Sequence, residues 1–154
     1  MKRQCAALME SLWKLQTDYI DLLLVHQPFG DYYGAYRAMQ LAYEKGKVRA
    51  IGLSNFYDAR FLDLAENMEV KPAVVQLETR VFSQQVKVCE LAKAYGTLVK
   101  AWSPLARGMN GLFSNEMLKA IGDKYHKDIA RICLKFLMDE GDYRHTLISH
   151  ARNA

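Results

Sequence analysis

Polar and aromatic side chains with the capacity for chemistry stand at the ends of successive apolar segments of this chain. The imidazole of His26 can polarise a substrate oxygen or pass a proton. Ser54, Asn55 and Gln76 can hydrogen-bond a planar amide, and the Trp102 ring can stack on a flat heterocycle. Each also has a plainer interpretation: a strand-capping histidine, a serine–asparagine turn, a structurally satisfied glutamine and a core tryptophan. Residue types alone leave both interpretations open.

A second group of candidate residues follows Trp102 directly. The segment Ser103-Pro104-Leu105 ends an apolar run, and Arg107, Gly108 and Gly111 come next. Glycines let the backbone approach a ligand closely, so this loop could embrace a pyrophosphate. A charged surface loop is the alternative. The tyrosine-rich stretch 31–36 is interpreted as a packing surface of a loop and a helix, without a catalytic role.

Two hydrophobic periods alternate along the chain and predict the elements that position these residues. Apolar residues at helical spacing predict helices over about 5–15, 32–43, 61–68, 84–94, 115–125 and 128–140, the last with Asp128 as its N-cap. Short continuous apolar runs predict buried strands at 19–25, 48–53, 73–77 and 97–102, with a weak final strand near 146–149. Strands that alternate with helices imply a parallel sheet with right-handed crossovers.

Five such strands could form an open doubly wound sheet or part of a barrel. No Gly-x-Gly-x-x-Gly turn follows any strand, so a dinucleotide-binding open sheet has no support. The candidate residues fall at the C-terminal ends of successive strands, the rim on which (β/α)8 barrels build their sites. We therefore predict an α/β fold over residues 1–154, a single domain forming a partial (β/α)8 barrel of about five parallel strands. His26, Asn55, Gln76 and Trp102 should gather around one opening.

Composition narrows the classes of partner and compartment. The 154 residues include 21 basic and 17 acidic side chains, a dispersed net charge of +4 that suits a phosphate-bearing ligand but not a nucleic-acid tract. Cys5, Cys89 and Cys133 are too far apart for a disulfide framework or a zinc site, which indicates a reducing, cytoplasmic setting without a metal. Neither a membrane-length apolar run nor a signal peptide is expected.

The ordered set of segments resembles the aldo-keto reductase family, from about residue 5 to about residue 140. Gly52-Leu53-Ser54-Asn55-Phe56 is the most specific match, and the stretch 26–35 resembles the bacterial branch of 2,5-diketo-gluconate and related aldehyde reductases. The other matching segments are Asp18-Tyr19-Ile20-Asp21-Leu22 through His26-Gln27-Pro28, Gly46 to Leu53, Pro72 to Glu78, and Ala101-Trp102-Ser103-Pro104-Leu105.

The resemblance implies an NADPH-dependent oxidoreductase that reduces small aldehydes or ketones to alcohols. His26 matches the family's catalytic histidine. Ser54, Asn55 and Gln76 match the residues that hold the nicotinamide carboxamide, and Trp102 stands where an aromatic ring packs against the nicotinamide. Ser103, Leu105, Arg107 and Gly108 match the loop along the pyrophosphate, and Arg152 matches an arginine that binds the 2′-phosphate.

Departures from the family pattern lower the activity expected of this chain. The family's catalytic aspartate, tyrosine and lysine align upstream of Met1, so we expect a truncated barrel made of family strands four to eight, with little turnover alone. Val75 replaces a usual asparagine, Arg80-Val81 replaces His-Pro, and the usual lysine is missing near Ser149. Exposed strand edges predict self-association. The alternatives are a non-catalytic nucleotide-binding or self-associating half-barrel, and a domain whose rim residues are merely satisfied polar groups.

Overall fold

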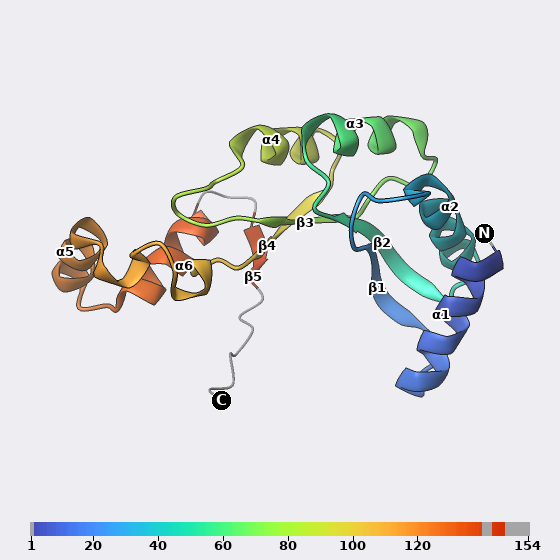
Figure 1. Ribbon diagram of the computed structural model, residues 1–154, viewed down its shortest axis with the longest axis horizontal. Helices are drawn as coiled ribbons and strands as arrows, with labels where there is room; N and C mark the ends of the chain where they lie inside the picture. The colour runs from blue at the N-terminus through green and yellow to red at the C-terminus, as the bar shows by residue number, and fades with distance from the viewer. Residues whose placement is uncertain (1, 140–142, 147–154) are drawn as a thin grey trace.

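The computed structural model describes residues 2–139 and 143–146, in which helices and strands alternate (Figure 1). The helices are α1 (Lys2–Leu15), α2 (Tyr32–Glu44), α3 (Asp58–Asn67), α4 (Val86–Ala94), α5 (Glu116–Tyr125) and α6 (Ile129–Asp139). The strands are β1 (Ile20–Val25), β2 (Val48–Ser54), β3 (Val74–Glu78), β4 (Leu98–Trp102) and β5 (Tyr143–Thr146). The predicted alternation is confirmed.

The strands form one parallel sheet in which each strand pairs with the next along the chain, in the order β1-β2-β3-β4-β5. Doubly wound sheets reverse their strand order at a switch point, whereas the wall of a (β/α)8 barrel keeps sequential order. The partial-barrel prediction is therefore confirmed over the described residues. β1 and β5 are the two edges of this sheet.

The two faces of the sheet differ in burial because side chains alternate across a strand. On one face, Val75, Leu77, Val99 and Ala101 are fully or almost fully buried, and α3 and α4 lie over this part of the sheet (Figure 1). We call the other side the open face. It carries half-buried or exposed side chains: Val74, Gln76 and Glu78 of β3, and Leu98, Lys100 and Trp102 of β4.

Local signals explain where several helices begin. Asp31, Asn115 and Asp128 each accept a hydrogen bond from the backbone N–H three residues later, the arrangement of an N-cap. The predicted cap at Asp128 is thus confirmed.

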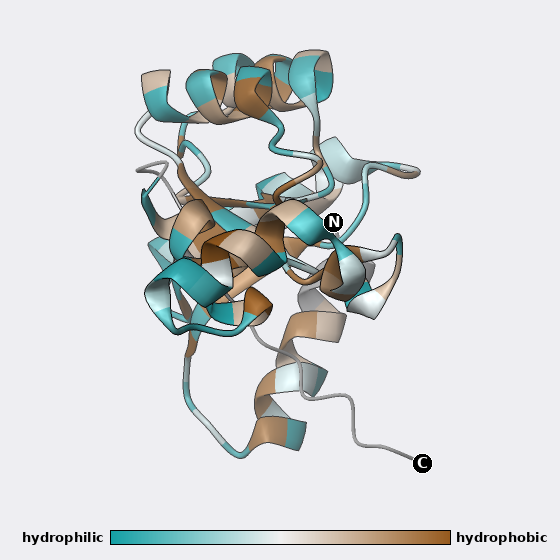
Figure 2. Cartoon of the chain, turned by 90° about the vertical axis from the view of Figure 1, so that its left-hand side faces the viewer, coloured by the Kyte–Doolittle hydropathy of each residue, from teal (hydrophilic) through white to brown (hydrophobic). Residues whose placement is uncertain are grey.

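The helix ribbons alternate between brown and teal, as expected for helices that bury one face (Figure 2). Tyr36 is fully buried and donates to the Val70 carbonyl oxygen, which confirms that the tyrosine-rich stretch packs.

Two predicted element starts were wrong, and the predicted loop after β4 has local structure. The last strand begins at Tyr143 and meets the predicted 146–149 only at Thr146, because pairing with β4 sets its position (Tyr143 opposite Val99). Helix α4 begins at Val86, since Gln85 adopts a left-handed backbone with φ of 56°. The loop after β4 contains two short 3-10 helices, Ala106–Gly108 and Leu112–Ser114. Leu147 to Ala154, including Arg152, lie outside the described residues.

Some classes of feature are absent from the described part of the chain. No helix there is long and apolar enough to cross a membrane. The same residues contain no cluster of three or more histidine, cysteine or acidic side chains arranged to hold a metal ion. Cys89 and Cys133 are buried, the Cys89 thiol donates to the Gln84 carbonyl oxygen, and burial raises the pKa of the Cys133 thiol. Both pack as small apolar residues in the hydrophobic core.

Candidate functional site

A cavity of about 440 Å³ opens at the C-terminal ends of β1 to β4. The sequence analysis placed His26, Asn55, Gln76 and Trp102 around one opening, and the structure brings all four to this cavity. Its complete lining is His26, Gln27, Ser54, Asn55, Gln76, Trp102 and Arg107. The predicted convergence is therefore confirmed, whereas the chemical role of each residue stays a prediction.

Strand register explains this convergence. Parallel pairing sets Ser54 opposite Gln76, so both lie at the same level of the sheet. The backbone N–H of Asn55 donates to the Gln76 carbonyl oxygen at 2.9 Å, which continues the β2–β3 ladder by one residue. Because the strands are parallel, their carboxyl ends share one edge, and the side chains that follow them meet there.

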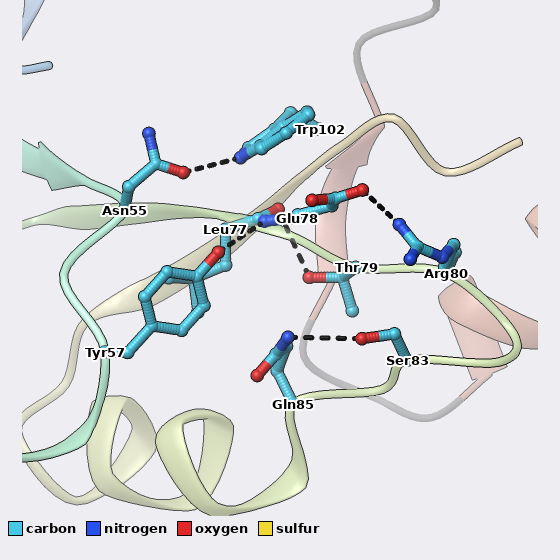
Figure 3. A network of polar contacts seen from close by, with 9 residues as sticks. All are labelled: Asn55, Tyr57, Leu77, Glu78, Thr79, Arg80, Ser83, Gln85 and Trp102. Atoms are coloured by element: carbon cyan, nitrogen blue, oxygen red, sulfur yellow. Dashed lines mark hydrogen bonds and ion pairs between the residues drawn. The ribbon is translucent and has the colours of Figure 1, made fainter. Parts of the chain in front are cut away.

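Asn55 joins the ends of several strands through its side-chain amide. Its oxygen accepts a hydrogen bond from the Trp102 indole Nε1–H at 2.9 Å (Figure 3). Its nitrogen donates to the His26 carbonyl oxygen and to Ser54 Oγ, both at 3.2 Å. Asn55 also adopts a left-handed backbone with φ of 62°. Asparagine tolerates this conformation better than most residues, which suits it to this corner.

Besides Arg107, three polar side chains of the cavity form no side-chain hydrogen bond within the described part of the chain. The His26 imidazole and the Gln27 and Gln76 amides have no hydrogen-bonding partner among the described residues. Gln27 and Gln76 are half-buried, and His26 is exposed. Polar groups withdrawn from water normally have partners, so free amides directed at a cavity are suited to a polar ligand. Of the two interpretations of Gln76 that the sequence left open, the described residues offer no hydrogen-bonding partner for the structural one.

The loop after β4 brings a cation to the cavity. The backbone is left-handed at Ala106, Arg107 and Gly108, with φ of 51°, 54° and 75°. This bend places the Arg107 guanidinium 5.5 Å from the centroid of the Trp102 ring, within cation–π range. Trp102 and Arg107 thus form one wall. Ser103, Leu105 and Gly108 belong to the same loop but do not line the cavity.

A polar network supports the end of β3 behind the cavity (Figure 3). The Glu78 backbone N–H donates to the Tyr57 hydroxyl oxygen at 3.3 Å. Arg80 pairs with the Glu78 carboxylate. The buried Thr79 hydroxyl donates to the Leu77 carbonyl oxygen at 3.2 Å. Glu78 is in register with Trp102, so this network steadies the strand beside the indole.

Gln27 is the lining residue that the sequence analysis did not select. It directly follows His26 and precedes Pro28, which is buried. Gln27 lies in a bend that the Phe29 backbone N–H closes by donating to the Gln27 carbonyl oxygen at 2.9 Å. That placement, a polar residue between the candidate residue His26 and a proline, was the available signal.

A sequential parallel sheet whose strand ends present an imidazole, amides and an indole to one cavity defines this chain as part of a (β/α)8-barrel protein. The sequence model of the aldo/keto reductase family matches residues 2–154. This chain belongs to the aldo/keto reductase family, a family of oxidoreductases.

Individual relatives agree with this assignment. The chain is 39% identical to a glyoxal reductase of Bacillus subtilis over 137 residues, and this alignment covers 88% of this chain and 49% of the relative. The crystal structure of a putative 2,5-diketo-D-gluconic acid reductase B superposes with a TM-score of 0.87 at 30% identity, over 97% of this chain and 54% of that one. A Bombyx mori aldo-keto reductase in complex with NADP gives a TM-score of 0.83 at 31% identity, over 95% and 54%. The chain thus spans about half the length of these relatives.

Proposed function

We propose that this chain supplies the histidine and the nicotinamide-binding wall of an NADPH-dependent carbonyl reductase that acts on small aldehydes or ketones. The observation that carries the proposal is the convergence of His26, Ser54, Gln76 and Trp102, from four successive strand ends, on one cavity. Two observations support it further: the Gln76 amide has no hydrogen-bonding partner among the described residues, and the chain's relatives include a glyoxal reductase and an NADP complex. In this proposal the described strands are family strands four to eight.

The cavity fits the nicotinamide end of the cofactor. The free Gln76 amide and the Ser54 hydroxyl can hydrogen-bond a carboxamide, and the Trp102 ring can pack against the pyridine ring. Asn55 belongs to the same wall. Ser103, Leu105, Arg107 and Gly108 follow the pyrophosphate, with the Arg107 cation closest to the cavity. Arg152, outside the described residues, is proposed for the 2′-phosphate.

When bound, NADPH supplies the hydride that converts a carbonyl carbon to an alcohol carbon. His26 is proposed to donate a hydrogen bond to the carbonyl oxygen, which draws electron density away from the carbon. The oxygen also needs a proton, and the family draws it from a tyrosine that no tyrosine here matches in position. General-acid catalysis contributes about 10²–10⁴-fold, so we expect weak turnover of glyoxal by this chain alone.

The direct test is a calorimetric titration of NADPH into the chain and into Gln76→Leu. Losing one neutral hydrogen-bonded amide removes about 0.5–1.5 kcal/mol, so the dissociation constant should rise roughly two- to tenfold. Gln40→Leu is the matched control, because Gln40 is a buried glutamine of α2 that does not line the cavity. Equal affinities of the chain and Gln76→Leu, or no NADPH binding, would refute the proposal.

A second candidate role is self-association as a half-barrel, without catalysis. Among the described residues, β1 pairs only with β2 and β5 only with β4, so each presents an unpaired edge. The open face also exposes Leu98, with 42% of its surface accessible. Unpaired edges recruit further strands. Light scattering should then show species larger than a monomer. Leu22→Lys on β1 should disperse these species, whereas the control Met117→Lys on exposed α5 should not. A monomer at every protein concentration argues against this role.

A further inference from the structure

Arg107 is the one arginine that lines the cavity within the described part of the chain. Arg49, Arg80 and Arg131 each pair with a carboxylate. Arg107 is exposed and pairs with no carboxylate among the described residues; it lies over the Trp102 ring, 5.5 Å from the centroid. A ring face attracts a cation without engaging its N–H groups as a carboxylate does, so the guanidinium nitrogens stay open to reaction.

We propose that Arg107 is the site at which a 1,2-dicarbonyl compound that enters the cavity without cofactor modifies the chain covalently. The inference rests on the proposed function for the glyoxal that the cavity admits. Glyoxal carries two adjacent aldehyde carbons, and the planar guanidinium fork presents two nitrogens that can reach both of them. A monoaldehyde has one such carbon and cannot close a ring, so the modification is specific to the dicarbonyl class.

The reaction balances without an oxidant or a reductant. Two guanidinium nitrogens each add to one carbonyl carbon, so two C–N bonds form and two C=O π bonds break. Each nitrogen loses a proton and each oxygen gains one, which leaves a five-membered ring with two neighbouring hydroxyl groups. This ring can then release one water. Because guanidinium groups are almost always protonated, the addition is slow at any arginine, and position decides which arginine reacts.

Confinement in the cavity favours Arg107. One molecule in a volume of about 440 Å³ corresponds to a local concentration of about 4 M. When glyoxal at about 1 mM fills one cavity in about a hundred, Arg107 meets it at about 40 mM, roughly forty times the bulk concentration. We therefore expect modification of Arg107 to outpace that of arginines elsewhere on the surface.

Arg37 of α2 is a matched control for this effect. It is exposed, pairs with no carboxylate in the part of the chain that the structure describes, and lies over the Tyr33 ring, 5.9 Å from the centroid. It does not line the cavity. Arg37 thus resembles Arg107 in exposure and in its aromatic neighbour, and differs from it in lying outside the cavity.

The first experiment compares the two arginines in one reaction. The chain is incubated with glyoxal without cofactor, and peptide mass spectrometry follows the gain of one glyoxal, with or without loss of water, at each arginine. We expect Arg107 to react roughly tenfold faster than Arg37, because part of the confinement gain is lost to unproductive orientations. Acetaldehyde should leave no ring adduct at either residue. Equal rates at Arg107 and Arg37 would overturn the proposal.

The second experiment adds saturating NADPH to the glyoxal reaction. The proposed function places the pyrophosphate along Arg107, so NADPH should slow modification of Arg107 to the rate at Arg37 and leave Arg37 unaffected. Calorimetry of NADPH binding distinguishes two failures. If NADPH binds and Arg107 reacts no faster than Arg37 without it, the modification proposal fails and the proposed function stands. If NADPH does not bind and Arg107 still reacts faster, the proposed function fails and the modification stands.

Discussion

The close approach of β2 and β3 depends on Gly52, and replacing it with alanine is the sharpest test of the sheet geometry. A Cβ at residue 52 would lie 2.3 Å from the Val74 carbonyl oxygen and 2.8 Å from Leu24 Cδ2, whereas ordinary contacts measure 3.4–4 Å. The Val74 oxygen belongs to the backbone and cannot rotate away. Relief therefore requires the two strands to separate.

Separation of the strands is opposed by hydrogen bonds on both sides of Gly52. Ala73 N donates to Ile51 O at 2.8 Å, and Asn55 N donates to Gln76 O at 2.9 Å. Overpacking with a backbone shift costs about 1–3 kcal/mol, and the rigid neighbour places this case near 3 kcal/mol. For a domain of this size, that loss lowers the midpoint of thermal unfolding by about 6–12 °C.

Urea denaturation and thermal melting by circular dichroism measure the effect of Gly52→Ala. Ala50→Val is the control, since Ala50 is a half-buried residue of the same strand and face. It adds two methyl groups and should change stability by less than about 0.5 kcal/mol. A Gly52→Ala protein as stable as the unmodified chain would refute the close approach, and with it the register that sets Ser54 beside Gln76.

Three further changes test other parts of the structure. The Tyr33 hydroxyl bonds the Asp63 carboxylate, and this bond, then desolvation and the negative charge, raise its pKa to about 12. The folded state therefore keeps a proton that the unfolded state releases near pH 10, so stability falls as pH rises from 10 to 12, and Tyr33→Phe should flatten this loss in urea titrations. Gln27→Leu removes an amide that bonds nothing in the described chain, so its melting midpoint should stay within about 2 °C; a larger drop would reveal a structural role. Asp128→Ala removes the N-cap of α6 and should lower the free energy of unfolding, measured by urea denaturation, by about 1 kcal/mol. The control Asp123→Ala, whose side chain caps no helix among the described residues, should leave it unchanged.

Much of this fold could be read from local pattern alone. Apolar runs marked β1 to β4 because strands buried under helices are hydrophobic on successive residues, and helical spacing marked the helices between them. Asp128 predicted the start of α6 because an N-cap side chain bonds a backbone N–H only three residues later. Topology then followed, since parallel strands with helical crossovers bring their carboxyl ends to one edge. That rule sufficed to gather His26, Asn55, Gln76 and Trp102.

The tertiary structure decided everything that depends on contacts between distant residues. The position of β5 came from its pairing with β4, and an apolar run at 147–148 could not reveal it. The inclusion of Gln27 in the cavity, and the lack of a partner for the Gln76 amide in residues 2–139 and 143–146, depend on which groups lie within reach. Above all, the sequence established that Asn55 and Trp102 stand at strand ends 47 residues apart. Only the folded sheet, by laying β2 and β4 on either side of β3, brings the indole N–H to the asparagine oxygen.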